Sequence, residues 1–480
     1  MTDSDSPRVV IVGGGLAGLS AAVSLAPHRL NVELLEARRG CGGRAGSYTD
    51  PVQQQDVDYC QHVGMGCCTH LLHFLDATEQ LPAWQRAREL TFIDRTGNRY
   101  RLIADRWLPA PLHLTRSMLR QGYLPWATRL AIATSLLRLA RDSKGPRDGR
   151  FYAWLESQRQ LPVAIDRFWN VILTSALGED VRHVAYKPAR KVFVDGFLRN
   201  STAYEVLIPK LALATLFGQR VPQWLQRHGI SVRSGAAVRD LLIEGNRATH
   251  VVLNDGTKIA ADHFIIAVPW HQLERTLGES AMRVVPNIER FREIPSAPIS
   301  GVHLWLDRPI TELPHAVFID RLSQWMFRRG ETGPQAAPQE ESPREHYVQV
   351  VISASRGLAG RERESVIEEI LDDLRASFPQ AREAKLLRAK IVTDPWAVFS
   401  VTPAVEQLRP NASTALENLF LAGDWTRTGW PATMEGAIIS GQRAAQCVLG
   451  PNLHHPPRQS PAPLPTSWLA RLLIRDEPAP

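Results

Sequence analysis

The chain has 480 residues, of which 44% are hydrophobic and 22% are charged, and its formal net charge is +7. This composition is typical of a globular protein with room for two or more domains. No apolar run reaches the roughly 20 residues that a membrane-spanning helix needs, and the polar N-terminus predicts no secretory signal. The five cysteines form no CxxC pair, which favours reduced thiols and a cytoplasmic location.

The first predicted element is a short buried strand over residues 8–12 that runs into a glycine-rich turn. Glycines at positions 13, 15 and 18 fit G-x-G-x-x-G, ahead of a helix predicted over residues 16–26. In such a motif the glycines allow a tight turn, backbone approach to a pyrophosphate and close helix packing. An ordinary glycine turn is the alternative. The residues of this predicted phosphate cradle are Gly13, Gly15, Leu16, Ala17 and Gly18.

A second predicted strand, over residues 31–35, ends in Glu36, where a carboxylate can accept hydrogen bonds from ribose hydroxyls. The stretch that follows, EARRGCGGR, resembles the E-A-R-x-x-x-G-G-R signature of the flavin-dependent amine oxidase and phytoene desaturase superfamily. The resemblance implies noncovalent FAD, with Arg44 against its pyrophosphate and NADPH at most a transient reductant. The matching residues are Glu36, Ala37, Arg38, Gly42, Gly43 and Arg44.

Residues 58–72, DYCQHVGMGCCTHLL, carry the next motif. They resemble a segment of carotenoid desaturases and of hydroxysqualene dehydroxylases, and the Q-H-x-x-x-G-C form favours the dehydroxylases. Tyr59 and Cys60 depart from the usual Asn-Gly of that segment. The resemblance implies that Gly64, Met65 and Gly66 border the flavin. It makes His62 a candidate proton donor, with a purely structural histidine as the alternative.

The positive charge is concentrated in one segment, because residues 106–150 hold nine Arg or Lys and two Asp. Within it, residues 106–144 mix Trp107, Tyr123 and Trp126 with leucine and arginine. Two or three short helices with apolar faces and basic rims would suit an anionic membrane surface. Core helices with solvated arginines are the alternative. We expect no nucleic acid partner, because no recognisable binding module is present.

Residues 229–269 predict strands joined by turns, with a hairpin at residues 254–256. In the superfamily a valine of this stretch, here Val238, touches the adenine region. Further on, VVISASRGLAGRE at residues 350–362 repeats the Gly-Leu-Ala-Gly of the opening motif. Ser355 replaces the first glycine and a charged helix follows, so no second dinucleotide site is expected there.

Residues 418–449 predict a strand, a sharp stop and a C-terminal helix, which resembles the closing motif of the superfamily. The resemblance places Asp424 near the ribityl or phosphate groups. It places the helix start at the flavin N1–C2=O edge, where a positive dipole end favours negative charge. The implied cofactor-binding residues are Gly423, Asp424, Thr433 and Met434.

The expected fold is α/β: a Rossmann-type FAD-binding domain of the GR2-like flavoprotein kind, with an inserted mixed α+β substrate domain and a helical membrane-facing segment. The FAD-binding domain is predicted from residues 1–75, 205–270 and 392–450. Residues 76–204 and 271–391 form the predicted substrate domain. Residues 451–480 form a proline-rich tail, whose segment 467–475 is an interfacial or a docked helix.

The resemblance implies an FAD-dependent oxidoreductase for an apolar isoprenoid lipid at the cytoplasmic face of an anionic membrane. The main expectation is reductive dehydroxylation of hydroxysqualene to squalene by hydride from reduced flavin, within squalene and hopanoid biosynthesis. The alternatives are a carotenoid desaturase or isomerase, a flavin amine oxidase, and a prenyl-lipid escort without redox activity. No metal site is expected, and the oligomeric state is left open.

Overall fold

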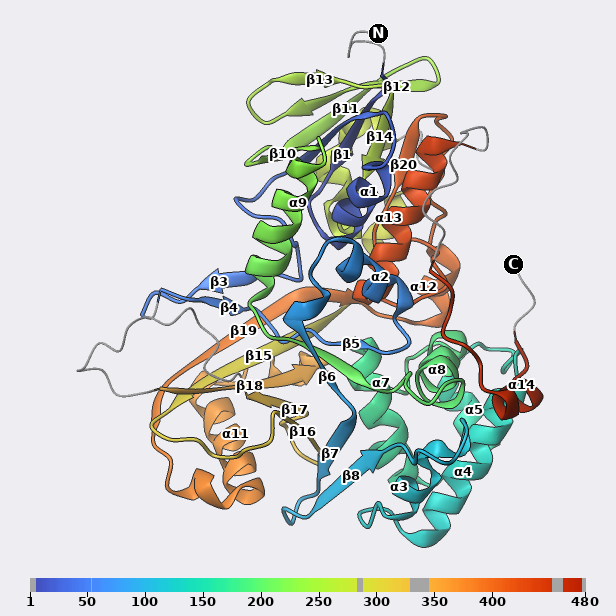
Figure 1. Ribbon diagram of the computed structural model, residues 1–480, viewed down its shortest axis with the longest axis vertical. Coiled ribbons are helices and arrows are strands. Elements are labelled where there is room, and N and C mark those ends of the chain that lie inside the picture. The colour runs from blue at the N-terminus through green and yellow to red at the C-terminus, as the bar shows by residue number, and fades with distance from the viewer. Residues whose placement is uncertain (1–5, 53, 283–287, 329–344, 451–460, 477–480) are drawn as a thin grey trace.

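The computed structural model describes residues 6–52, 54–282, 288–328, 345–450 and 461–476. A parallel sheet and its helices occupy the top of Figure 1, a larger mixed sheet lies below it, and a group of helices lies at the lower right. Segments from both ends of the chain meet in the upper part, where α1 and α13 lie side by side. Segments far apart in the chain therefore contribute to this upper part.

Five parallel strands form the upper sheet in the order β10-β2-β1-β14-β20. Alternate residues of β1 face opposite sides: Val9 and Ile11 pack against the helices, while Val10 and Val12 pack toward the three-stranded sheet β11–β13. Burial on both faces explains why β1 is apolar throughout. The strands are β1 (Arg8–Val12), β2 (Asn31–Glu36), β10 (Ser231–Ser234), β11 (Val238–Glu244), β12 (Arg247–Leu253), β13 (Lys258–Ala260), β14 (His263–Ile266) and β20 (Leu419–Leu421).

Glycines allow close backbone contacts within this domain. A Cβ atom at position 18 would lie 1.9 Å from the Gly13 carbonyl oxygen, so α1 (Leu16–Leu25) packs against the turn before it only with glycine there. A Cβ atom at Gly441 of α13 (Met434–Leu449) would lie 2.1 Å from the Ala17 carbonyl oxygen. The predicted strand–glycine turn–helix is confirmed, and α13 crosses α1 at backbone distance.

A seven-stranded mixed sheet forms the floor of the second domain, in the order β19-β15-β18-β17-β16-β7-β8. One face carries Val302 and Val350 against α11 (Arg363–Ser377), whose Ile370 and Leu374 are buried there. The other face turns toward the helices of this domain. The strands are β7 (Glu89–Ile93), β8 (Arg99–Ile103), β15 (Ser296–Leu306), β16 (His315–Phe318), β17 (Trp325–Arg328), β18 (His346–Ser353) and β19 (Leu386–Phe399).

The helical part is held by an aromatic core in which the Trp169 and Phe193 rings meet edge to face at 4.7 Å. Its helices are α3 (Thr115–Leu119), α4 (Trp126–Arg141), α5 (Phe151–Ser157), α6 (Pro162–Ala164), α7 (Asn170–Leu177) and α8 (Tyr186–Phe193). The short helices predicted within residues 106–144 are thus confirmed as α3 and α4. Within the described ranges, no helix is both long enough and apolar enough to cross a bilayer.

Short elements connect the two domains. In the small sheet β5-β9-β6, strand β9 lies between β5 and β6. The sheet therefore joins residues 64–65 and 84–87 to the start of the 205–270 segment of the cofactor-binding domain. The remaining α-helices and strands of the described residues are β3 (Ser47–Thr49), β4 (Asp56–Asp58), β5 (Gly64–Met65), α2 (Thr69–Ala77), β6 (Trp84–Ala87), β9 (Val206–Pro209), α9 (Val221–Arg227), α10 (Leu273–Met282), α12 (Pro403–Leu408) and α14 (Trp468–Leu473).

The repeated Gly-Leu-Ala-Gly after β18 has a structural role. Arg356 in this turn forms a two-pronged ion pair with the fully buried Glu179, with both N–O distances at 2.8 Å. The neighbouring guanidinium and the Ser400 hydroxyl hold the pKa of Glu179 below its ordinary value, although burial opposes this. The turn therefore clamps the end of α7 to the mixed sheet.

Candidate functional site

The glycine turn after β1 leaves open space at one position. The Gly13 amide donates to the Leu35 carbonyl at 2.8 Å, and φ of +106° at Gly13 makes the tight turn. At Gly15 the backbone is extended, and a Cβ atom there would meet nothing within 4 Å. This empty space lies at the N-terminus of α1, which is where a pyrophosphate would approach the backbone.

Glu36 is buried at the carboxyl end of β2, and backbone donors fix its carboxylate. One oxygen accepts from the Gly14 amide at 2.7 Å and the other from the Arg38 amide at 2.8 Å. An ionised carboxylate has further lone pairs with which to bind ribose hydroxyls. The Ala236 amide donates to the Glu36 carbonyl at 2.9 Å, so the start of β11, with the half-buried Val238, follows directly beside it. The predicted adenosine end of the site is brought together here.

The second glycine motif lies backbone to backbone against the first. The Gly42 amide donates to the Gly14 carbonyl at 2.8 Å, and a Cβ atom at Gly43 would lie 3.2 Å from the Gly15 Cα. Side chains larger than hydrogen would separate the two turns. The exposed Ala37 and Arg38 lead into this turn, and Arg44 leaves it.

Arg44 and Asp424 join the two distant motifs. The Arg44 guanidinium donates to the Asp424 carboxylate at 2.5 Å and to the Ala397 carbonyl at 2.9 Å. It also lies 5.7 Å from the ring centre of Trp270. The Asp424 side chain is buried and the Arg44 side chain is partly exposed, so the cation can still be shared with a bound phosphate.

The loop that carries Asp424 is held by a residue that the sequence analysis missed. Arg409 is buried, and its guanidinium donates to the carbonyls of Asp424, Thr426 and Trp430 at 3.0, 2.7 and 2.6 Å. Gly423 begins the loop with φ of +143°, and a Cβ atom there would lie 2.3 Å from the Trp425 indole nitrogen. Arg409 belongs to no local motif, because its acceptors are carbonyls that the fold brings to it.

The closing helix α13 begins as predicted. Thr433 caps it, since its hydroxyl accepts from the Gly436 amide at 3.1 Å, and Met434 is the first helical residue. Glu435 has a second role that the sequence did not reveal. Its two carboxylate oxygens accept from the His70 and Leu71 amides at 3.0 and 2.7 Å, in the first turn of α2. One buried carboxylate therefore joins the N-termini of α2 and α13.

Burial raises the pKa of Glu435 from 4.5 to about 7. Between these values the folded protein binds a proton that the unfolded chain has released, so the free energy of unfolding falls as the pH rises. The Glu435→Gln variant cannot titrate at this position. Between low and high pH, its free energy of unfolding should therefore fall by on the order of 3 kcal/mol less than that of the wild type. Urea unfolding of FAD-free protein near pH 5 and near pH 8 measures it. An unchanged difference between the two pH values would contradict this role, and Glu156→Gln, at an exposed carboxylate of α5, is the control.

The segment over residues 61–66 packs tightly against the substrate domain. Gly64 and Met65 form β5, and a Cβ atom at Gly66 would lie 2.1 Å from the Thr202 carbonyl oxygen. His62 is half-buried, and its Nδ1 lies 3.0 Å from the Cys60 carbonyl oxygen. Burial lowers the pKa of His62, and the Arg44 cation adds to this effect. The structure therefore places a neutral imidazole, rather than a charged acid, near Arg44 at pH 7.

Two aromatic residues after β14 line the same region. The rings of His271 and Trp396 stack at 4.7 Å, and Trp270 meets Trp396 at 6.3 Å. Within the described part of the chain, Trp270 Nε1 and His271 Nδ1 are buried without a hydrogen-bond partner. A buried polar group without a partner costs about 1–3 kcal/mol. A bound ligand with acceptor groups would satisfy such donors.

Lys191 reaches the closing loop from the substrate domain. Its Nζ lies 4.4 Å from the Trp430 ring centre and 2.8 Å from the Asp195 carboxylate. Its positive charge lowers the pKa of Glu435, against the effect of burial. No motif pointed to Lys191, since it lies in α8, far along the chain from both cofactor motifs.

These groups fit FAD. The open turn at Gly15 and the N-terminus of α1 suit its pyrophosphate, Glu36 suits the ribose, and the capped N-terminus of α13 suits the ring edge. When bound, FAD supplies hydride transfer at its isoalloxazine ring. The chain's own residues bind and orient it, and Arg44 and Asp424 join the halves of the site.

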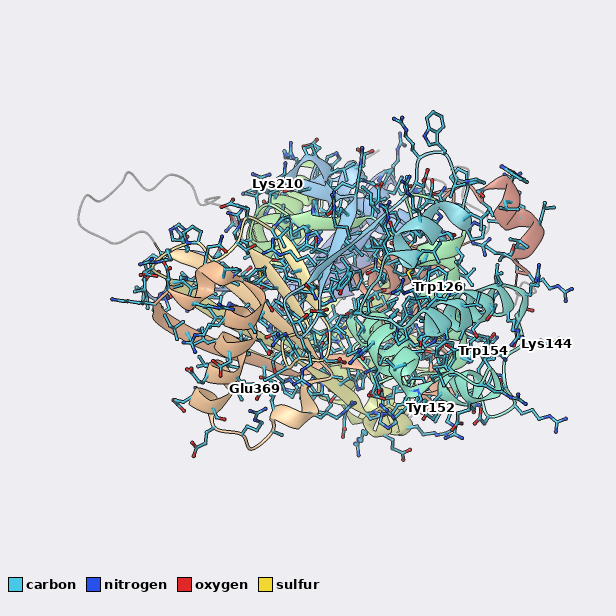
Figure 2. All side chains as sticks on the ribbon, turned by 90° about the horizontal axis from the view of Figure 1, so that it is seen from below. Trp126, Lys144, Tyr152, Trp154, Lys210 and Glu369 are labelled. Atoms are coloured by element: carbon cyan, nitrogen blue, oxygen red, sulfur yellow. The ribbon has the colours of Figure 1, made fainter. Side chains whose placement is uncertain are left out.

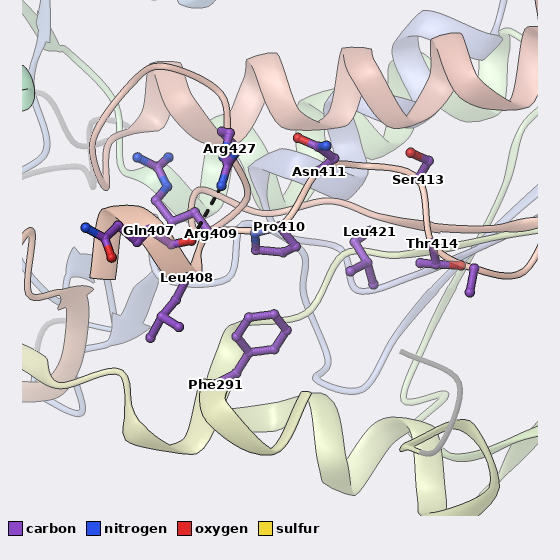
Figure 3. A pocket seen from close by; sticks show the side chains of 11 residues that line it. Phe291, Gln407, Leu408, Arg409, Pro410, Asn411, Ser413, Thr414, Leu421 and Arg427 are labelled. Atoms are coloured by element: carbon purple, nitrogen blue, oxygen red, sulfur yellow. Dashed lines mark hydrogen bonds between the residues drawn. The ribbon is translucent and has the colours of Figure 1, made fainter. Parts of the chain in front are cut away.

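A cavity of about 290 Å³ lies beside Leu421, at the end of β20. Phe291 forms one wall, and Arg409 and Arg427 lie at the other, where Arg427 donates to the Gln407 carbonyl (Figure 3). None of its eleven lining residues belongs to the predicted cofactor-binding set. We therefore do not assign the cofactor to this cavity.

The chain is similar to known proteins over nearly its whole length. The chain is 24% identical to the 15-cis-phytoene desaturase of Synechococcus elongatus, over 96% of this chain and 99% of that protein. It is 25% identical to a probable zeta-carotene desaturase of the same organism, over 92% of this chain and 98% of that protein. The crystal structure of an oxidoreductase from Methanosarcina mazei superimposes with a TM-score of 0.68 at 17% identity, covering 90% of this chain and 98% of that one.

The family comparison covers most of the chain. Residues 16–449 match the model of the flavin containing amine oxidoreductases. This range includes the third glycine of the cradle, Gly18, the Arg44 motif and the closing helix α13. The chain belongs to the family of flavin containing amine oxidoreductases, and it is an FAD-dependent oxidoreductase.

Proposed function

We propose that this enzyme acts on a long acyclic isoprenoid lipid. The likeness to the phytoene and zeta-carotene desaturases carries the proposal, because it extends over nearly the whole length of each protein. It therefore includes the substrate domain as well as the cofactor-binding domain. Family membership and the intact set of cofactor-binding residues argue against a prenyl-lipid escort without redox activity.

The relatives favour desaturation as the reaction. Desaturation removes a hydride and a proton from adjacent carbons of the substrate and leaves a double bond. An external acceptor such as a quinone must then reoxidise the cofactor. A neutral His62 at pH 7 is compatible with proton acceptance in such a reaction.

The second candidate is reductive dehydroxylation of hydroxysqualene, which residues 61–67 favour through their Q-H-x-x-x-G-C form. In this reaction a hydride replaces the hydroxyl group, and the hydroxide leaves as water after taking up a proton. The two electrons come from a donor such as NADPH. Exclusion of water would protect a carbocation-like carbon from side reactions.

One experiment tests the substrate class and separates the reactions. FAD-loaded enzyme is given phytoene with a quinone, or hydroxysqualene with NADPH or chemically reduced flavin, and the products are identified by mass spectrometry. A desaturated carotenoid supports the first reaction and squalene supports the second. Peroxide release from a panel of amines, with neither lipid product, would overturn the proposal in favour of an amine oxidase. Enzyme carrying Gly15→Val serves as the cofactor-free control.

A further inference from the structure

Large apolar side chains are exposed together at one corner of the molecule. Trp107 is 78% exposed, Leu472 is 74%, Trp468 is 64%, and Trp126 and Leu130 are each 63%. They belong to α4, α14 and the loop over residues 104–111, at the lower right of Figure 1. Soluble proteins rarely expose neighbouring apolar groups of this size without a partner.

The three segments that carry these side chains are neighbours, because α14 is hydrogen-bonded to the other two. The Ser467 hydroxyl donates to the Ala110 carbonyl, in the loop that carries Trp107. At the other end of α14, the Arg475 amide donates to the Ala140 carbonyl at 2.9 Å, in the last turn of α4. We call the exposed surface of α4, α14 and this loop the tryptophan face.

One stripe of α4 contributes to the tryptophan face. Trp126, Leu130 and Leu137 are spaced by four and seven residues, so they project from one side of the helix, while Ile132 and Leu139 are buried on the other. Figure 2 views this helix from below, with Trp126 at its start and Lys144 beyond its end. The apolar stripe therefore points away from the core rather than into it.

Arginines surround the exposed tryptophans. Arg106 lies 4.6 Å from the Trp107 ring centre and Arg129 lies 5.5 Å from that of Trp126. Residues 106–141 contain six arginines and neither Asp nor Glu. Tryptophan and arginine on one surface suit the boundary between lipid headgroups and acyl chains, where rings insert and cations meet phosphates.

Hydrogen bonds and an ion pair hold α14 and the residues that follow it against the helical part. The buried Arg190 guanidinium donates to the carbonyls of Arg475 and Ala140 at 2.6 and 3.0 Å. Arg199 pairs with Asp476 at 2.5 Å, and Ala470 is buried. The helix is thus docked, which was one of the two alternatives for residues 467–475, while residues 451–460 of the predicted tail lie outside the described residues. Docking fixes which side of α14 faces outward.

We propose that the tryptophan face, with α14 as its C-terminal part, docks the enzyme on the surface of an anionic phospholipid bilayer. Anionic lipids are concentrated in the cytoplasmic leaflet, which places the enzyme at that face. A second copy of the chain is a poorer occupant, since pairing would bring two arginine-rich surfaces together. The proposal does not depend on the isoprenoid assignment, so each can fail without the other.

Vesicle sedimentation of the full-length FAD-loaded enzyme tests the proposal. Wild type is expected to bind vesicles of mixed phosphatidylcholine and phosphatidylglycerol, and to bind less as salt increases. The double variant W468S/L472S should lower the bound fraction roughly tenfold, because both side chains insert into the interface. The control L387S/V52S removes two exposed apolar side chains, 42% and 67% exposed, from outside this face and should bind as wild type does.

Charge reversal gives the second arm. The double variant with Arg116→Glu and Arg120→Glu reverses two exposed charges, one within α3 and one directly after it. It should weaken binding to the anionic vesicles but leave binding to vesicles without anionic lipid unchanged. Arg129 is left intact because it donates to the Leu124 carbonyl at 2.7 Å. Equal sedimentation of W468S/L472S and wild type would overturn the proposal. A wild-type dimer that becomes monomeric in W468S/L472S, without vesicle binding, would assign the face to a second copy.

Discussion

Replacing Gly15 with valine is expected to abolish FAD uptake while leaving the unfolding midpoint close to that of the wild type. The backbone at Gly15 is extended, and a Cβ atom there meets nothing within 4 Å, so we expect the folded chain to accommodate the substitution. The same space is the one that the pyrophosphate needs. Flavin absorbance per protein after incubation with FAD, together with thermal unfolding, measures the two effects.

Gly18→Ala is the matched contrast. Its Cβ atom would lie 1.9 Å from the Gly13 carbonyl oxygen, so α1 must move and the fold itself should be destabilised. FAD loss in both variants, with loss of stability only at position 18, is the expected pattern. Normal flavin content in Gly15→Val would show that the pyrophosphate does not lie against this turn.

The second large effect is expected at the ion pair between Arg44 and Asp424. Arg44→Met leaves a buried carboxylate without its cation, which costs about 3 kcal/mol of stability. FAD affinity should also fall, because the variant loses the cation that the family resemblance places against the pyrophosphate. The double variant Arg44→Met with Asp424→Asn removes the unpaired charge and is expected to recover most of the stability.

FAD affinity separates the binding role from the structural role. If Arg44 binds the cofactor, the double variant should be stable and yet hold FAD at least tenfold more weakly, about 1.4 kcal/mol. Titration of FAD against stable double variant, followed by flavin fluorescence, measures this. Wild-type affinity in that variant would assign Arg44 to the fold alone.

The sequence was sufficient for the framework of the site. The buried β1, the glycine turn and the acid-ended β2 follow from local patterning, and each lies where it was predicted. The membership of Arg44 and Asp424 in one site came from resemblance to a family. Their direct contact could not be read from either motif, because it depends on how the intervening chain folds.

The residues that the sequence analysis missed share one physical property. Arg409 holds carbonyls of a distant loop, Trp270 supplies a buried indole nitrogen, and Glu435 caps a helix that begins at Thr69. None of these roles leaves a periodic or spaced pattern, since each depends on which groups the tertiary structure places around the side chain. Such residues become visible only when the tertiary structure places a donor beside an acceptor.

The close contact between α1 and α13 at Gly441 determines when the cofactor-binding domain can complete its folding during translation. The helix that begins the cofactor-binding domain contacts, through its backbone, the helix that ends it. During translation the first βα unit therefore waits for almost the entire polypeptide to leave the ribosome before its surface is covered. Contacts between such distant segments form slowly, so the nascent chain should depend on chaperone protection until α13 is made.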